Sequence, residues 1–154
     1  MCYMVLLSTD SPEDLSLNND SLVSFTREMP GLPEESLLLH QHRWFVGSAH
    51  GCSCGFRHLH TSAIDLGFGE PVEWYEEEPE DIEATVKFCS VVRRLVGSGA
   101  SVDCIDAWAH GGANVELEDT VHVLLSEVDD SQFRFFESHH FVFEAKTNAA
   151  RIPH

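Results

Sequence analysis

Histidine and cysteine side chains are concentrated between residues 40 and 60, where half of the ten histidines and two of the five cysteines occur. Thiolate sulfur and imidazole nitrogen are ligands that Zn²⁺ prefers, and they also serve iron and copper. Cys52 and Cys54 are separated by one residue, and Gly51 and Gly55 on either side let the backbone turn tightly enough for both sulfurs to face one centre. The segment therefore predicts a metal site or a reactive thiol.

The ligand set predicted for a metal combines this Cys-x-Cys pair with histidines on both sides of it. A structural zinc site usually contains two pairs of the Cys-x2-4-Cys or His-x3-5-His type, whereas this segment has one shorter pair. Zinc is still the candidate cofactor, because thiolate and imidazole are its preferred ligands. The sequence does not decide which histidine would complete the set. The predicted metal ligands are His42, His50, Cys52, Cys54 and His58, with His60 as an alternative.

The same residues support two other interpretations. Arg57 and His58 closely follow Cys54, and positive charge near a cysteine lowers its pKa, so the segment could instead contain a redox-active or nucleophilic thiol. A disulfide between Cys52 and Cys54 would be strained and easily reduced, which suits a switch. In the remaining interpretation these side chains belong to a strand and a loop and share no centre. Cys2 stands apart from the segment and is assigned no role.

Acidic residues dominate the charge of the chain. Nine Lys and Arg residues against 26 Asp and Glu residues give a net charge of −17 at pH 7, which repels both a phosphate backbone and an anionic membrane surface. We therefore expect neither nucleic acid nor a membrane as a partner. The carboxylates between Glu73 and Glu83 could dock a basic protein, which gives a third functional alternative, an acidic interaction module. Hydrolase chemistry is not predicted.

The chain shows no sign of export or of membrane insertion. Its first residues lack a basic segment followed by a long apolar run, and no run approaches the ~20 apolar residues that a spanning helix needs. We therefore expect a cytoplasmic location, with cysteines reduced or metal-bound rather than paired in structural disulfides. The length of 154 residues predicts one domain over residues 1–154, with a frayed tail at 145–154.

The strongest predicted element is a helix over residues 80–97. Apolar residues recur along it at helical spacing, on a stripe that contains Ile82, Val86, Cys89, Val92 and Val96. Pro79 suits the first turn of this helix, and Gly97 to Gly99 suit its end. The stripe predicts that the helix packs on a sheet.

Short apolar or alternating runs predict strands on both sides of this helix, at residues 2–7, 22–26, 37–46, 102–108, 120–128, 133–136 and 141–144. Residues 47–72 lack such a period and are expected to form a long Gly/His/Cys-rich loop. Asp103 and Asp106 could line the mouth of a pocket but are expected to close a strand, and His139 and His140 are expected to lie in an exposed turn. The order of elements, with no βαβ repetition, predicts an α+β fold, a mostly antiparallel sheet with one long helix packed on one face.

Overall fold

The structure is a computed structural model, which describes residues 2–49, 51–109 and 117–145. The strands within these ranges are β1 (Cys2–Thr9), β2 (Val23–Thr26), β3 (His42–Ser48), β4 (His58–Leu59), β5 (Val102–Ala109), β6 (Asp119–Leu124), β7 (Phe135–Phe136) and β8 (His139–Glu144). The helices are α1 (Pro79–Gly97) and the short 3-10 helices η1 (Leu15–Asn18), η2 (Pro33–Leu37) and η3 (Thr61–Leu66).

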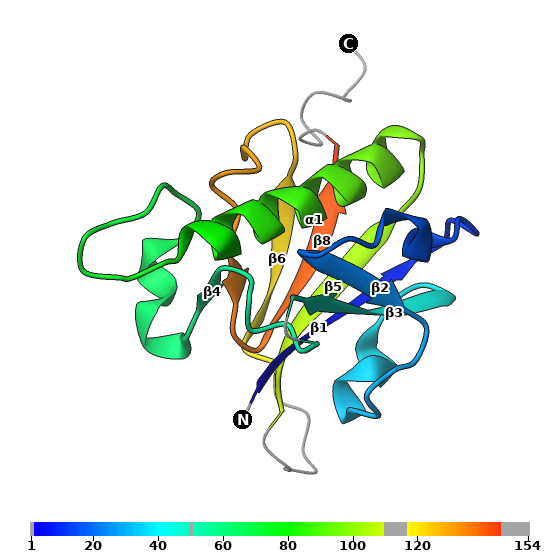
Figure 1. Cartoon of the computed structure of the whole chain (residues 1–154). Helices are drawn as coiled ribbons and strands as arrows, with labels where there is room; N and C mark the ends of the chain where they lie inside the picture. Colours follow the sequence, from blue (N-terminus) through cyan, green and yellow to red (C-terminus); the bar gives the residue numbers. More distant parts are fainter. Residues whose placement is uncertain (1, 50, 110–116, 146–154) are drawn as a thin grey trace.

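Six of these described strands form one sheet in the order β2-β3-β1-β5-β8-β6, and β4 pairs separately with β7. Every neighbouring pair in the six-stranded sheet is antiparallel except β6 and β8. The helix α1 lies diagonally across one face of this sheet, as Figure 1 shows. The predicted α+β fold class is confirmed, and α1 begins one residue before the predicted helix and ends with it.

The helix α1 covers the sheet with one apolar face. Pro79 occupies its first turn, where the missing N–H would have had no partner in the helix, and acidic residues in the same turn complement the helix dipole. The buried side chains of α1 pack with those of the central strands into the larger apolar core. This face is centred on Phe88 and Leu95, which are fully buried, whereas Ile82 and Val86 of the predicted stripe are only half-buried.

The strand predicted over residues 37–46 is shorter than expected and begins at His42. The residues before it form η2 and then an irregular stretch whose N–H groups are bonded by side chains instead of by a neighbouring strand. Leu39 donates its N–H to Asp103 Oδ2 at 3.1 Å, and His40 donates its N–H to the Ser8 hydroxyl at 3.0 Å. This stretch thereby covers part of the sheet face that α1 leaves free, where a smaller apolar cluster lies.

The strand β8 adds the one parallel pairing of the described six-stranded sheet and corrects one prediction for the C-terminal part of the chain. It pairs antiparallel with β5 but parallel with β6, because the chain crosses over through residues 125–138 before β8 begins. His139 and His140, which were expected in an exposed turn, are buried within β8, and the turn is made by Ser138 with φ 61°. The prediction that Asp103 and Asp106 close a strand is wrong, because both lie within β5 and are buried. Asp103 instead organises buried polar contacts, and His140 Nε2 lies 2.6 Å from its Oδ2 atom.

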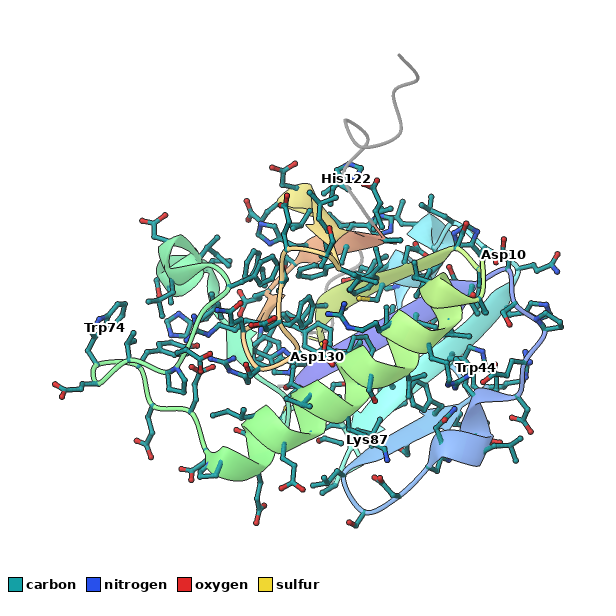
Figure 2. The ribbon with its side chains drawn as sticks, turned by 90° about the horizontal axis from the view of Figure 1, so that it is seen from above. Asp10, Trp44, Trp74, Lys87, His122 and Asp130 are labelled. Carbon is teal, nitrogen blue, oxygen red and sulfur yellow. The ribbon has the colours of Figure 1, made fainter. Side chains whose placement is uncertain are left out.

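The outer side of α1 is polar, as the view from above in Figure 2 shows. Lys87 pairs with Asp20 at 3.1 Å, and Arg93 pairs with Asp130 at 2.8 Å. Trp74 extends into solvent from the loop before the helix. Of the described helices, none has the length and apolar composition that crossing a bilayer requires.

The central strand β1 determines which residues meet at each end of the sheet. Its pairing with β3 ends at Val5 opposite Val46, and beyond that point β1 continues to Cys2 with only β5 beside it. At the other end, Thr9 lies opposite His42. The first residues of β1 are therefore open to other contacts on the side where β3 has ended.

Candidate metal centre

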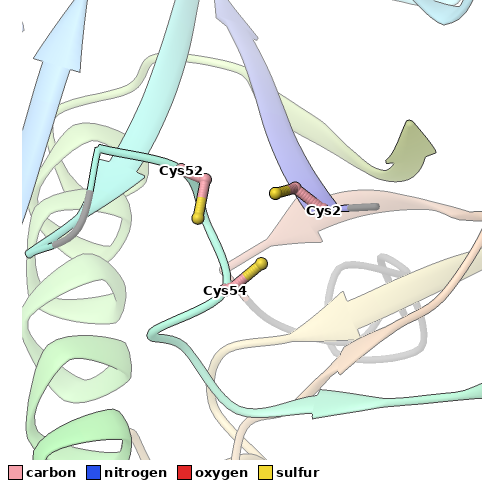
Figure 3. Close-up of side chains that lie close together, drawn as sticks. All are labelled: Cys2, Cys52 and Cys54. Carbon is pink, nitrogen blue, oxygen red and sulfur yellow. The ribbon is translucent and has the colours of Figure 1, made fainter. Parts of the chain in front are cut away.

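Three cysteine side chains meet at this open end of β1. Cys2 comes from the strand itself, and Cys52 and Cys54 come from the loop between β3 and β4. Their sulfur atoms all lie within 4.8 Å of one another, and Figure 3 shows the three side chains turned toward a common centre. A tetrahedral zinc ion with Zn–S bonds of about 2.3 Å places its sulfurs about 3.8 Å apart, so only a small closure separates this arrangement from coordination.

Ser53, between the two loop cysteines, fixes the loop to the sheet. It is completely buried, and its N–H donates to the Tyr3 carbonyl at 3.1 Å. Its hydroxyl accepts from the Val5 N–H at 2.7 Å and donates to the Val46 carbonyl at 2.5 Å. Ser53 therefore bridges β1 and β3 where their own pairing stops. The Tyr3 N–H in turn donates to Cys54 Sγ at 3.3 Å, which connects the strand directly to one sulfur.

The glycines on either side act as the sequence predicts. Gly51 has φ +86°, a left-handed conformation that other residues rarely adopt. Gly55 donates its N–H to Ser48 Oγ at 2.9 Å, and the same hydroxyl donates to the Cys52 carbonyl at 2.8 Å. This tight turn places Cys52 and Cys54 on the same side of the buried Ser53.

Charge on the cluster is distributed unequally. Burial opposes ionisation of Cys52, but hydrogen bonds from the backbone of Cys54 and from the thiols of Cys54 and Cys2 outweigh it and hold the pKa of Cys52 below its usual value. Burial raises the pKa of Cys54 to about 12, with a further contribution from its hydrogen bond and repulsion with Cys52. Cys52 therefore ionises more readily than an ordinary cysteine, and Cys54 ionises less readily.

His58, a predicted ligand, lies behind the cluster with both ring nitrogens engaged. Nδ1 is 2.8 Å from Asp106 Oδ2, and Nε2 is 2.5 Å from the Ser53 carbonyl oxygen. The ring stacks on Tyr3 with the centroids 4.0 Å apart. In this arrangement the ring holds the loop backbone and offers no nitrogen to a metal.

The other predicted histidines lie elsewhere. His42 is opposite Thr9, seven residues along β1 from Cys2 and therefore about 23 Å away at about 3.3 Å per residue. His60 is exposed and lies 2.5 Å from the Ser62 hydroxyl through Nδ1. His50 lies outside the described residues. Of the predicted ligands, the structure brings together Cys52 and Cys54, and it adds Cys2.

The positive charge expected beside Cys54 is paired with a carboxylate. The Arg57 guanidinium is buried, and its Nε donates to Glu77 Oε2 at 2.8 Å. Arg134, also buried, donates to Glu77 Oε1 at 2.7 Å, and both arginines donate further bonds to carbonyls of residues 67–70. The prediction that Arg57 lowers the pKa of Cys54 is therefore wrong, because Glu77 neutralises that charge; the thiol with a lowered pKa is Cys52.

The acidic run of residues 73–83 occupies the loop before α1 and the start of the helix. Most of its side chains are exposed, and the pKa of Glu78 is raised by its hydrogen bond with Glu76 and by repulsion from its acidic neighbours. Glu77 is buried, because two arginines enclose its carboxylate. Docking of a basic protein on this run stays a prediction, and Glu77 would take no part in it.

A signal for hydrolase chemistry is present in the same segment, since residues 51–55 match Gly-x-Ser-x-Gly, the pattern of a nucleophile elbow. Ser53, His58 and Asp106 are also the residue types of a Ser-His-Asp triad. The geometry does not fit that role. His58 faces the carbonyl oxygen of Ser53, whereas the Ser53 hydroxyl is buried and bonded to the backbone of β1 and β3. Ser53 is therefore a structural residue here.

A cavity of about 240 Å³ lies beside the cluster. Its walls include Cys54, Tyr3, His60 and Tyr75. The Tyr75 hydroxyl donates to the His58 carbonyl at 2.6 Å, which holds this wall against β4. Of the three cysteines, Cys54 therefore borders this cavity, and it is exposed.

Comparison of the chain with protein families, with curated proteins and with solved structures finds no match. The function must therefore be inferred from the geometry of the described residues alone.

Proposed function

We propose that this protein binds a thiophilic metal ion, with Zn²⁺ as the first candidate, through Cys2, Cys52 and Cys54. The observation that supports this most directly is the approach of three sulfur atoms to within 4.8 Å from two segments that lie 50 residues apart in sequence. Sulfur ligands select zinc and Cu⁺ over the harder cations magnesium and calcium. The hydrogen bonds of Ser53 position the loop in advance, so binding requires little rearrangement of the backbone.

The protonation of the cluster determines how a cation competes with protons for the sulfurs. Without one, the raised pKa of Cys54 keeps its thiol protonated beside Cys52. A divalent ion bound by three thiolates displaces their protons and leaves a complex with one net negative charge. Three protein ligands leave a tetrahedral zinc ion one further position, which a fourth side chain or a small molecule in the adjacent cavity can fill. The ion also connects the first residue of β1 to the loop, which suits a structural or regulatory role.

The test is elemental analysis of protein purified in reducing buffer without chelator and then reconstituted with zinc. We expect about one zinc ion per chain. Cys2→Ser, Cys52→Ser and Cys54→Ser should each reduce the stoichiometry or the affinity. Cys89→Ala removes a core thiol that lies outside the cluster, and His42→Gln removes a histidine at the far end of β1, so both serve as controls. Wild-type protein that binds no metal would overturn the proposal.

A thiol switch is a second candidate, favoured by the lowered pKa of Cys52 beside two other thiols. In such a switch the Cys52 thiolate attacks a small disulfide and releases one half of it as a thiolate. Cys2 or Cys54 then loses its proton, attacks the mixed disulfide and releases the second thiolate, so one disulfide of the protein is formed. Alkylation at neutral pH followed by mass spectrometry should label Cys52 much faster than the other cysteines, and uniformly slow labelling would contradict this role.

A further inference from the structure

We propose that His58 and Asp106 are positioning residues of the metal centre, which hold the Cys52–Ser53–Cys54 segment in its binding geometry through the carbonyl of Ser53. This inference rests on the proposed metal-binding function. It assigns a role to a buried histidine and a buried carboxylate that the three sulfurs themselves do not explain.

The direction of each hydrogen bond follows from the atoms involved. A carbonyl oxygen can only accept, so His58 Nε2 carries a proton and donates it to Ser53 across 2.5 Å. Nδ1 then either donates to the Asp106 carboxylate or accepts from its protonated form across 2.8 Å. Either arrangement fixes the orientation of the imidazole and keeps Nε2 directed at the loop.

The ring has little freedom to turn away. Tyr3 stacks on it with an interplanar angle of 5°, and Phe135 stacks near it with the centroids 5.4 Å apart. Asp106 is completely buried in β5, directly opposite Val5 of β1, whose N–H donates to the Ser53 hydroxyl. The same end of the β1–β5 pair thus holds both the hydroxyl and the carbonyl of Ser53.

The carboxylate of Asp106 also has a feature that destabilises the fold. Its Oδ1 atom is buried and has no hydrogen-bond partner among the described residues, and a buried acceptor without a partner destabilises a fold. The presence of a carboxylate at position 106 is therefore better explained by its contact with His58 than by a contribution to stability.

The hydrogen bond from His58 reaches the sulfurs through one peptide group. The Ser53 carbonyl belongs to the same peptide as the Cys54 N–H, so the bond from His58 fixes the orientation of the peptide group that leads into Cys54. Donation to the carbonyl polarises the peptide and strengthens its N–H as a donor. Outer partners of this kind orient metal ligands and tune them, and their loss typically costs about 10- to 100-fold in metal affinity.

Two substitutions of His58 separate its two contacts. His58→Asn places an amide near the Nδ1 position, so it can keep the contact with Asp106 but cannot reach Ser53. His58→Gln places an amide N–H near the Nε2 position, so it can still donate to Ser53. His140→Gln is the matched control, since His140 is likewise buried and bonded to an aspartate, Asp103, on the other face of β5.

The experiment measures Zn²⁺ affinity of the full chain by competition with a chromophoric chelator in reducing buffer. His58→Asn should weaken binding about 10- to 100-fold, while His58→Gln and His140→Gln should stay within a few-fold of wild type. The charge-transfer band of Co²⁺-loaded His58→Asn should still report three thiolates, which shows that the ligands are retained.

Two results would overturn the inference, namely wild-type affinity in His58→Asn or equal weakening in His58→Gln. If His58→Asn does not fold, the double variant His58→Phe with Asp106→Leu replaces it, because this variant removes the Ser53 contact and leaves no buried charge. Failure of wild-type protein to bind zinc would instead reject the metal-binding function itself, so the two failures are distinguishable.

Discussion

A Cβ atom on Gly55 would lie 2.6 Å from Ser48 Oγ and 2.8 Å from Ser48 Cβ, closer than Cβ atoms approach such neighbours in proteins. Because Ser48 also accepts the Gly55 N–H and donates to the Cys52 carbonyl, it cannot turn away without releasing the cysteine loop. The closeness of these two residues therefore shapes the cysteine loop of the proposed metal centre as well as the fold.

Gly55→Ala should displace the loop, weaken zinc binding and destabilise the protein by about 1–3 kcal/mol, the usual cost of overpacking. Zinc competition and urea unfolding measure the two effects. Gly97→Ala is the matched control, since nothing lies within 4 Å of the Cβ it would add. Normal zinc affinity in Gly55→Ala would show that the turn adapts and that its shape does not control the site.

Zinc should stabilise the folded chain, because the ion connects the start of β1 to a loop 50 residues later. At free zinc 100 times the dissociation constant, the expected gain is about 2.7 kcal/mol, which corresponds to a rise in Tm of about 5–10 °C for a chain of this length. Thermal unfolding in metal-buffered solutions measures it. The gain should vanish in Cys54→Ser and persist in Cys89→Ala, and a rise of equal size in both would indicate binding elsewhere.

Zinc binding should release protons, since the raised pKa of Cys54 keeps that thiol protonated at neutral pH while Cys52, with its lowered pKa, ionises more readily. We expect about two to three protons per ion, and hence an apparent affinity that increases with pH. Calorimetry in buffers of different ionisation enthalpy counts the protons. A pH-independent affinity between pH 6 and 8 would contradict coordination by these thiols.

Much of the fold could be predicted from the sequence because its signals are local. The helix α1 follows from the helical spacing of its apolar residues and from Pro79, and the pairing of Cys52 with Cys54 follows from their neighbouring positions. The parallel pairing of β6 with β8 could not be predicted in this way. Strand direction depends on the path of residues 125–138, and no local period records that path.

The remaining members of the site depend on contacts between distant segments. Cys2 joins the cluster because β3 stops pairing with β1 at Val5, which is a matter of register that the sequence does not reveal. His58 has the right residue type for a metal ligand, yet the same imidazole serves equally well as a hydrogen-bond donor, and only the positions of Ser53 and Asp106 decide between these roles. The burial of Glu77 was likewise concealed by the exposed carboxylates around it.

Glu77 should control the acid stability of the protein. Burial opposes its ionisation, but the hydrogen bonds and charges of Arg57 and Arg134 outweigh that effect and lower its pKa below the ordinary 4.5. A carboxylate with a lowered folded-state pKa contributes stability above pH 4.5 and loses it as the pH falls through the folded-state value. Urea unfolding between pH 7 and pH 3 should therefore show decreasing stability in the acid range.

Glu77→Gln tests the assignment at neutral pH, where it should cost about 3–5 kcal/mol because it leaves two buried arginines without their counter-charge. The acid-dependent loss should also become smaller in this variant, since the titrating group is gone. Glu80→Gln, in the exposed first turn of α1, is the control and should change stability little. If Glu77→Gln changes the free energy of unfolding only slightly, solvent must already stabilise the charges of the two arginines.

His50 is the predicted ligand that lies outside the described residues, and it precedes Cys52 by two residues. Three thiolates leave a tetrahedral zinc ion one position short, which makes His50 a candidate for that position. If His50 binds zinc, His50→Gln should lower the zinc affinity by more than about tenfold, the typical cost of losing an outer partner. The substitution should also shift the ligand-field bands of the Co²⁺ form, while the sulfur charge-transfer band persists. His42→Gln, at the opposite end of β1, should change neither property. Unchanged affinity and spectra in His50→Gln would assign the fourth position to water or to a small molecule in the cavity beside Cys54, and the centre would then have an exchangeable site.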